Sequence, residues 1–155
     1  MKIALIAPLA ESVPPRLYGG TERVVSYLAD ELVRLGHDVT LFASGDSTTS
    51  ARLMACTRTG LRLAGINDHT ASLLAMLDRV LRSADRFDIL HFHLDFLHFP
   101  TFRHLADKCL TTLHGRQDLP DFWPAYGAFP ELRLVSISDA KASKCAVHSH
   151  LWPIT

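Results

Sequence analysis

The feature that most constrains this chain is an apolar run, a glycine loop and an amphipathic segment at its start. Residues 2–8 are almost entirely apolar, and Gly19-Gly20 lies in the loop that follows them. Apolar residues then recur at a period of 3.6 over residues 24–33, which predicts a helix with one buried face. A second apolar run covers residues 39–43. Because parallel strands need a crossover helix between them, this order predicts a β-α-β unit.

The ends of the predicted helix carry their own signals. Thr21 is the expected N-cap, Glu22 an acidic residue of the first turn, and Gly36 the expected C-cap. A glycine loop that leads into a helix N-terminus leaves backbone N–H groups that can meet an anion. Glycines also occur in this position simply because a tight turn needs them, so Gly19-Gly20 alone is a weak indication of a phosphate site.

Composition excludes several classes of protein. The chain has 155 residues, of which 48% are hydrophobic, so one domain with a real core is expected rather than disorder. Sixteen Lys and Arg balance sixteen Asp and Glu, which argues against a nucleic-acid binder. The three cysteines form no CxxC motif, and no run approaches the roughly 20 apolar residues of a membrane span. We therefore expect a cytoplasmic protein, with peripheral membrane contact left open.

The rest of the chain alternates between strand and helix patterns. Further strands are expected at residues 52–56, 88–93, 108–113 and 132–138. Helices are expected from Asp68 or Thr70 to an end at residues 84–87, from Pro100, in part of 122–126, and after a cap at Asp139. This alternation predicts an α/β fold with a doubly wound, mostly parallel, Rossmann-like sheet.

Polar residues follow the predicted strands, and in such sheets ligands bind outside the carboxyl ends of the strands. We therefore expect these groups to converge along one edge of the sheet. They are Gly19-Gly20, Ser44-Gly45-Asp46, His93 with Asp95, His114-Gly115, and Ser136 with Ser138.

Histidines are the most reactive side chains in these positions. His91 and His93 share one face of a strand, and with Asp95 they form a candidate zinc site; the alternative is that they are core and strand-end histidines. His114 is suited to orienting a sugar hydroxyl or carrying a proton, or to a structural bond with a loop carbonyl. Asp46 with His93 or His114 is a candidate general-base pair.

Several common motifs are absent. The chain contains no Gly-x-Ser-x-Gly, no P-loop and no Gly-x-Gly-x-x-Gly, which argues against a serine hydrolase, an ordinary ATPase or a NAD enzyme. Aromatic residues gather at positions 92–102 and 122–126. Core packing explains most of them, and Trp123 is the best candidate for a functional aromatic side chain.

The order of the motifs resembles the N-terminal half of a GT-B glycosyltransferase, of the retaining family 4 that includes sucrose and mannosyl transferases. The resemblance covers essentially the whole chain. It rests on Lys2-Ile-Ala-Leu-Ile, Gly19-Gly20-x-Glu22, Gly36-His37-x-Val39, Asp88-Ile-Leu-His91-x-His93, Thr112-x-His114-Gly115 and Val135-Ser136-x-Ser138.

The resemblance implies two Rossmann-like domains with a cleft between them, the N-terminal one holding mainly the acceptor. Gly19 and Gly20 would approach the diphosphate of a sugar nucleotide, Glu22 matches the Glu of that motif, and His114 would lie near the transferred sugar. We therefore expect His114 to be catalytic. The expected binding residues are Gly19, Gly20, Glu22, His93 and Ser138. No metal and no cofactor is expected, because the nucleotide-sugar is a donor substrate; the acceptor would be a sugar, a lipid or a small molecule.

The family's second domain, with its Glu-x7-Glu pair, has no counterpart before Thr155. We therefore expect residues 1–155 to be a single acceptor-side domain that is truncated, lacks the donor-binding domain and is inactive alone. Self-association, or a separate chain that carries the donor domain, would follow from an exposed cleft face. Two alternatives remain: a non-catalytic partner subunit of a split transferase, and an unrelated metal-dependent enzyme that uses His91, His93 and Asp95.

Overall fold

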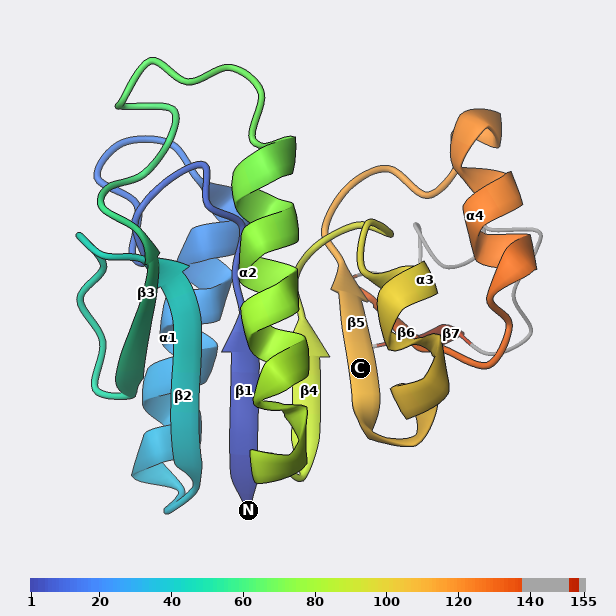
Figure 1. The fold of residues 1–155 in the computed structure, drawn as a ribbon, viewed down its shortest axis with the longest axis horizontal. Helices are drawn as coiled ribbons and strands as arrows, with labels where there is room; N and C mark the ends of the chain where they lie inside the picture. The colour runs from blue at the N-terminus through green and yellow to red at the C-terminus, as the bar shows by residue number, and fades with distance from the viewer. Residues whose placement is uncertain (138–150, 154–155) are drawn as a thin grey trace. The chain divides into compact units, whose positions relative to one another are not determined.

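A computed structural model describes residues 1–137 and 151–153 of the chain, which divides into two compact units (Figure 1). The first unit comprises Met1–Leu90 and the second His91–Thr155. Strand β4 (Ile89–Phe92) crosses the boundary, with its first two residues in the first unit and its last two in the second.

The first unit is built on parallel strands. They are β1 (Lys2–Ile6), β2 (Asp38–Ser44) and β3 (Arg52–Thr57), and within this unit the strand order is β3-β2-β1-β4. β1 pairs with β2 with Lys2 opposite Asp38, and β2 pairs with β3 with Thr40 opposite Arg52. β1 and β2 are buried along nearly their whole length, as expected of parallel strands that are covered on both faces.

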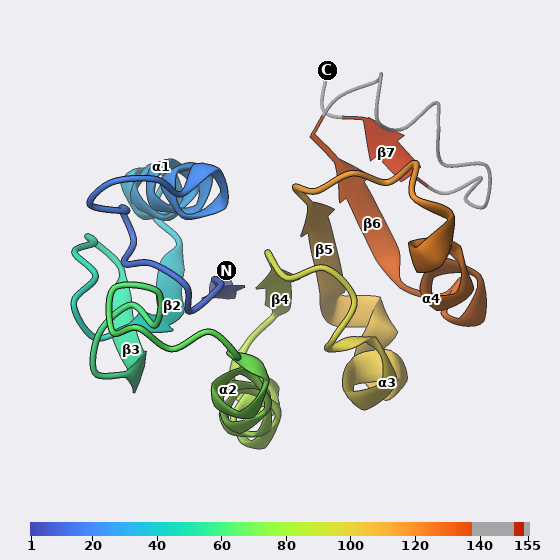
Figure 2. The same ribbon diagram turned by 90° about the horizontal axis from the view of Figure 1, so that it is seen from above.

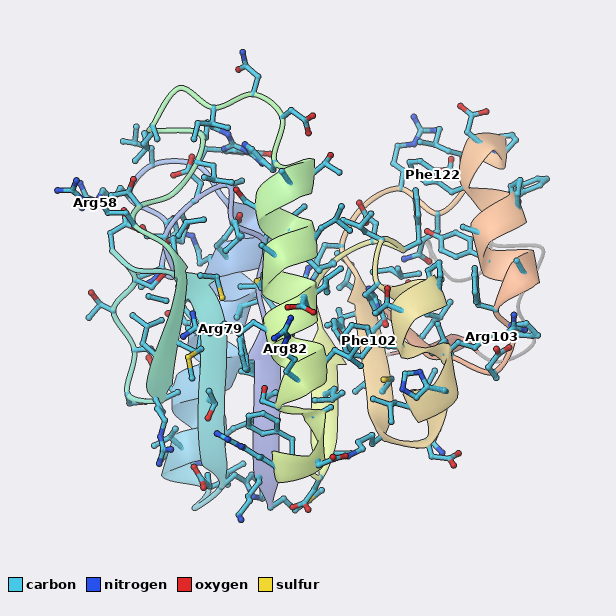
Figure 3. All side chains as sticks on the ribbon, in the orientation of Figure 1. Arg58, Arg79, Arg82, Phe102, Arg103 and Phe122 are labelled. Atoms are coloured by element: carbon cyan, nitrogen blue, oxygen red, sulfur yellow. The ribbon has the colours of Figure 1, made fainter. Side chains whose placement is uncertain are left out.

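Helices cover the two faces of the first unit's strands (Figure 2). α1 (Gly20–Arg34) packs Val25 and Ala29 against Ile3 and Leu5 of β1 in one hydrophobic cluster. α2 (Thr70–Arg82) lies on the opposite face, where its Arg79 Nη1 donates a hydrogen bond of 2.6 Å to the Ala55 carbonyl of β3 (Figure 3). After α2, the short helix η1 (Ala84–Arg86) leads directly into β4. The unit is therefore doubly wound, as the sequence predicts.

The helix ends agree with prediction only in part. α1 begins at Gly20 with Gly19 as its N-cap, so the predicted N-cap Thr21 is wrong and lies inside the first turn. The C-cap is Leu35, so the predicted C-cap Gly36 lies one residue further on, where it adopts a left-handed φ of 85° and donates its N–H to the Val33 carbonyl. α2 begins at Thr70, whose N–H is accepted by the carboxylate of Asp68 at 2.9 Å.

The second unit continues the parallel pattern with the strand order β4-β5-β6-β7. The strands are β5 (Cys109–Leu113), β6 (Arg133–Ser136) and β7 (Leu151–Pro153). β5 and β6 pair with Leu113 opposite Ser136. The connections are short helices: α3 (Phe99–Phe102), η2 (Arg103–Lys108), η3 (Pro120–Phe122) and α4 (Trp123–Ala128).

Aromatic side chains form the core of the second unit. Phe102 of α3, labelled in Figure 3, contacts Phe92 of β4 edge-on, with ring centroids 4.8 Å apart. Phe99 and Tyr126 are also buried. Most of the aromatic cluster is therefore core. Trp123 is half-buried, and its indole N–H is buried without a hydrogen-bond partner among the described residues.

The α/β class and the parallel sheet are confirmed. Ser138 and Asp139, predicted as a binding residue and a helix cap, lie outside the described residues. β7 has no counterpart among the predicted strands. Of the helices in the described part of the chain, none has both the length and the apolar character needed to cross a membrane.

Candidate functional site

Two histidines project from the same side of β4 in the second unit. The rings of His91 and His93 are tilted against each other with centroids 4.3 Å apart, which confirms that they share a face. They share it because side chains two residues apart on a strand point the same way. His93 follows the last residue of β4, so it lies just beyond the carboxyl end of the strand.

Each of these histidines forms a hydrogen bond with a residue at the carboxyl end of the neighbouring strand β5 or just after it. His91 Nε2 lies 2.8 Å from Thr112 Oγ1, and His93 Nδ1 lies 2.9 Å from His114 Nε2. His114 follows Leu113, the last residue of β5, so two strand ends are joined by a bond between imidazoles. This confirms that His93 and His114 meet at the carboxyl ends of their strands.

Burial controls the charge of these rings. The pKa of His91 falls to about 4, mainly because burial disfavours the cation and further because of His114. Burial likewise holds the pKa of His93 well below its ordinary value, with His91 and His114 adding to the effect. Both rings on β4 are therefore neutral near pH 7. His91 and His93 therefore bind through hydrogen bonds rather than through charge.

The same contacts bear on the predicted metal site. His91 Nε2 and His93 Nδ1 are occupied by Thr112 and His114, and Asp95 lies in the following loop, with its Oδ1 3.6 Å from where a Cβ on Gly115 would stand. Across residues 1–137 and 151–153, no three His, Cys, Asp or Glu side chains are grouped so that they could hold a metal ion. The arrangement of His91, His93 and Asp95 gives the metal-enzyme alternative no support.

In the first unit, the Gly19-Gly20 loop joins β1 to α1, and its two glycines have different surroundings. A Cβ on Gly19 would lie 2.7 Å from Glu22 Oε2 and 2.8 Å from Pro15 Cβ, so packing requires the glycine. A Cβ on Gly20 would meet no described heavy atom within 4 Å. The backbone at Gly20 is therefore open at the N-terminus of a helix, which is where an anion can approach.

Two buried carboxylates lie beside this loop. Burial raises the pKa of Glu22, although its own backbone N–H and Arg62 act in the opposite direction. Glu11 is 2% exposed; its Oε1 accepts a bond of 3.1 Å from Arg62 Nη1, and its Oε2 has no partner among the described residues. Sequence analysis missed Glu11 and Arg62. The available signal for Glu11 was a charged residue at the end of the apolar run that continues past β1 through residues 7–10.

Other predicted site residues have local structural partners. Asp46 accepts bonds from Ser44 Oγ at 2.7 Å and from the Gly60 N–H at 3.1 Å, so its carboxylate braces a loop of the first unit. Ser136 is buried at the end of β6. The candidate site is thus described as two parts, one in each unit: Gly19, Gly20 and Glu22 with Glu11, and His91, His93 and His114.

Solved structures with a similar fold include sugar-transferring enzymes. AviGT4, a glycosyltransferase involved in avilamycin A biosynthesis, matches with a TM-score of 0.60 at 23% identity over 93% of this chain and 38% of its own. An α-glucosyltransferase, solved in complex with UDP and a 13-mer DNA, matches with a TM-score of 0.54 at 12% identity over 100% of this chain and 42% of its own.

The fold is also shared with a protein of another kind. The C-terminal domain of the coenzyme A biosynthesis bifunctional protein CoaBC matches with a TM-score of 0.54 at 13% identity, over 90% of this chain and 74% of its own. At such identities the likeness shows the fold alone. The chain spans well under half the length of the two glycosyltransferases it matches.

The sequence itself identifies the family. No curated protein matches it significantly. Residues 18–150, however, match the model of Glycosyltransferase Family 4, which takes in both the Gly19-Gly20 loop and the histidine cluster. The chain therefore belongs to Glycosyltransferase Family 4, and its fold is that of an N-terminal GT-B lobe.

Proposed function

We propose that this chain is the acceptor-side lobe of a glycosyltransferase that moves a sugar from a nucleotide-sugar to an acceptor with retention of configuration. His114 is the proposed catalytic residue, and Gly20 is the proposed point of approach for the donor diphosphate. The acceptor is a sugar, a lipid or a small molecule. Two structures of similar fold support this proposal: AviGT4 is a glycosyltransferase, and the α-glucosyltransferase was solved in complex with UDP.

The observation that carries the proposal is the position of His114. It stands at the carboxyl end of β5, half-buried, with one ring nitrogen bonded to a buried histidine of the next strand. An imidazole held in this way has a fixed orientation at the edge where α/β sheets bind their ligands.

We also propose that residues 1–155 do not transfer sugar alone. One helix N-terminus contributes on the order of 1 kcal/mol toward an anion. Millimolar binding requires about 4 kcal/mol and micromolar binding about 8 kcal/mol. The open backbone at Gly20 falls short of either value, so most of the donor affinity must come from groups outside this lobe.

Calorimetric titration of the isolated chain with UDP-glucose and GDP-mannose tests the second point. We expect no saturable heat in the micromolar range. Saturable micromolar binding, or release of nucleoside diphosphate by the chain alone, would show that the lobe is self-sufficient.

Transfer itself is tested by a chimera in which this chain replaces the matched N-terminal part of AviGT4. Release of nucleoside diphosphate in the presence of mixed sugar acceptors is measured for the unchanged chimera and for His114→Ala, with His104→Ala on the exposed side of η2 as the matched control. We expect His114→Ala to lose at least about 100-fold in rate, as removal of a positioned acid, base or donor does. Equal rates in both variants would remove His114 from the mechanism.

A further inference from the structure

The first unit contains a cavity at the amino ends of its strands. Its volume is about 270 Å³, and its walls include the first residues of three parallel strands, which are Lys2 of β1, Asp38 of β2 and Arg52 of β3. The Gly19-Gly20 loop follows the carboxyl end of β1. The cavity therefore lies at the opposite end of the strands from the part of the candidate site that belongs to this unit.

Strand geometry explains why these charged side chains meet. Side chains alternate between the two faces of a strand, and Ile3 and Val39 belong to the hydrophobic cluster under α1. Lys2 and Asp38, one residue earlier on paired strands, therefore point to the opposite face, which α2 covers (Figure 2). The register of β2 with β3 places Arg52 on this same face. Three charged side chains thus share one face and one end of the strands.

The segment that follows α2 forms the other wall of the cavity. Arg86 of η1 and the next residue, Phe87, line it, and the Phe87 ring contacts that of Phe42 in β2 edge-on with centroids 6.0 Å apart. Arg79, labelled in Figure 3, ties α2 to the Ala55 carbonyl of β3 further along the strand. The cavity is therefore enclosed by helical and strand residues that hold one another in place.

The cavity has an apolar floor and a charged rim. Phe42 is 1% exposed, and Met54 and Phe87 are half-buried, so two rings and a thioether form the floor. The exposed lining residues are all charged: Lys2, Asp38, Arg52 and Arg86. An apolar floor under a charged rim suits a ligand that has an apolar body and one charged end.

The rim carries an excess of positive charge. Three basic side chains line the cavity against the single carboxylate of Asp38, whereas the whole chain has equal numbers of basic and acidic residues. Among the described residues, the ion pairs involve other arginines, and none includes Lys2, Arg52 or Arg86. The rim is therefore set up to receive an anion.

Two further carboxylates make Arg52 the main cation of this rim. Asp85 and Asp88 line a neighbouring hollow, which Lys2 and Arg86 also border. Asp88 Oδ2 accepts a hydrogen bond of 2.7 Å from the backbone N–H of Lys2, so this carboxylate lies close to the Lys2 backbone. Arg52 does not line that hollow. An anion in the cavity therefore meets least competition for the guanidinium of Arg52.

From this arrangement we infer that the cavity binds a small organic phosphate monoester, with its apolar group on Phe42 and Met54 and its phosphate on Arg52. A guanidinium offers a phosphate two parallel N–H donors, and a phosphate monoester carries about −1.5 to −2 charges near pH 7, which matches the excess on the rim. Ligand pockets usually measure about 300–1,000 Å³, so a cavity of about 270 Å³ suits an apolar group of one ring. This site is separate from the proposed function and does not depend on it.

The order of floor and rim distinguishes two sources of such a group. A free ester enters with its apolar end first and leaves its phosphate at the rim. A phosphatidic acid headgroup on a bilayer presents its phosphate first and keeps its chains in the membrane, which would leave the apolar floor uncovered. The cavity therefore favours the free ester over the lipid.

The test is a titration of the 15N-labelled chain, followed by amide NMR, with phenyl phosphate, inorganic phosphate and benzyl alcohol as the probes. We expect saturable shifts at the first residues of β1, β2 and β3 and at η1, and at least about tenfold tighter binding of phenyl phosphate than of either other probe. Shifts centred on Gly20, equal affinity for inorganic phosphate, or no saturation by about 10 mM phenyl phosphate would overturn the inference.

Variants identify the side chains that hold the ligand. Arg52→Gln should weaken phenyl phosphate at least about tenfold. Arg58→Gln is the matched control, because Arg58 is also exposed, follows the other end of β3 and loses the same charge (Figure 3). Met54→Gln keeps the length of the side chain but makes the floor polar, so phenyl phosphate should then bind little better than inorganic phosphate. The amide spectrum of each free variant shows that it is folded, and equal weakening by Arg52→Gln and Arg58→Gln would contradict a built site.

Cosedimentation with vesicles of phosphatidylcholine and phosphatidic acid separates the two sources. We expect no vesicle binding that Arg52→Gln reduces. Vesicle binding that depends on Arg52, in a chain that does not bind phenyl phosphate, would assign the cavity to a lipid headgroup and overturn the free ester.

Discussion

At the scale of single residues, His98 shows how a buried imidazole ties stability to pH. It is fully buried, and its ring stacks on that of Phe92 with centroids 3.9 Å apart. Its Nε2 lies 2.9 Å from Thr111 Oγ1. Burial lowers its pKa to about 3 from the ordinary 6.5. Between these values the unfolded chain binds a proton that the folded chain does not, so stability falls as the pH drops through this window.

We predict that the double variant His98→Phe with Thr111→Val has a flatter acid dependence. The aromatic ring keeps its contact with Phe92, and the valine removes the hydroxyl that would otherwise be left unpaired. The free energy of unfolding, measured in urea at about pH 7.5 and about pH 5, should fall less in the variant than in the parent chain. His104→Phe, on an exposed position of η2, is the control, and an acid dependence equal to the parent's would contradict the role of His98.

Glu22 has the opposite effect on the pH dependence of stability. Burial raises the pKa of this carboxyl above its ordinary 4.5, so the folded chain holds the proton more tightly than the unfolded chain does. Stability is then greatest at low pH and is lost as the pH rises through the raised pKa. We predict that Glu22→Gln raises the melting temperature near pH 7 and leaves it unchanged below about pH 4. A lower melting temperature at pH 7 would mean that attraction to Arg62 outweighs the cost of burying the charge.

At the scale of elements, two neighbouring glycines at the junction between the loop and α1 differ in the space available for a side chain. Gly19→Ala forces a Cβ against Pro15 and the Glu22 carboxylate, whereas Gly20→Ala adds a methyl in open space at the first helical residue. We predict that Gly19→Ala destabilises the chain by about 1–3 kcal/mol, as overpacking does. Gly20→Ala should be neutral, or stabilising by up to about 1 kcal/mol, since alanine favours helix. Urea unfolding compares the two, and equal effects would show that the loop relaxes around either methyl.

Element by element, hydrophobic periodicity predicted most of the strands and long helices. β3 lies within about a residue of its predicted range, and α2 begins at the predicted Thr70, because their buried faces repeat at the periods of a strand and a helix. α2 ends at Arg82, before the predicted end at residues 84–87, where the separate short helix η1 forms instead. The cap of α1 was missed, since Thr21 has the preferred side chain but the packing of Gly19 against Pro15 and Glu22 starts the helix earlier. A preferred capping side chain is therefore overridden here by packing of the residues just before and after the helix start.

The site was predicted less completely than the fold. The sequence places His93 and His114 at strand ends, and parallel pairing brings them together. Which nitrogen faces which, and that His93 is buried, depends on three-dimensional packing that no sequence pattern records. The carboxylate of Glu11 was missed for the same reason: its bond to Arg62 joins residues 51 positions apart.

At the scale of the whole molecule, exposed apolar side chains next to the glycine loop indicate an uncovered surface. Leu17 is 76% and Tyr18 is 79% exposed, and Arg62 Nη1 donates to the Tyr18 carbonyl at 3.3 Å, which ties this loop to the one that contains Leu63 and Ile66. The latter two side chains are also exposed. Large apolar side chains gathered on neighbouring loops are typical of surfaces that meet another polypeptide.

We predict that the isolated chain self-associates through this surface, which comprises Leu17, Tyr18, Leu63 and Ile66. Sedimentation velocity over a concentration series should show a rising average mass, and Leu17→Ser with Tyr18→Ser should shift the midpoint to at least about tenfold higher concentration, equivalent to about 1.4 kcal/mol. Tyr27→Ser with Leu35→Ser, which removes two exposed apolar side chains elsewhere in the first unit, is the matched control. Because association buries apolar area, the effect should weaken on cooling. A chain that stays monomeric at millimolar concentration, or a control pair with the same effect as the Leu17 and Tyr18 pair, would show that this surface is not the one that associates.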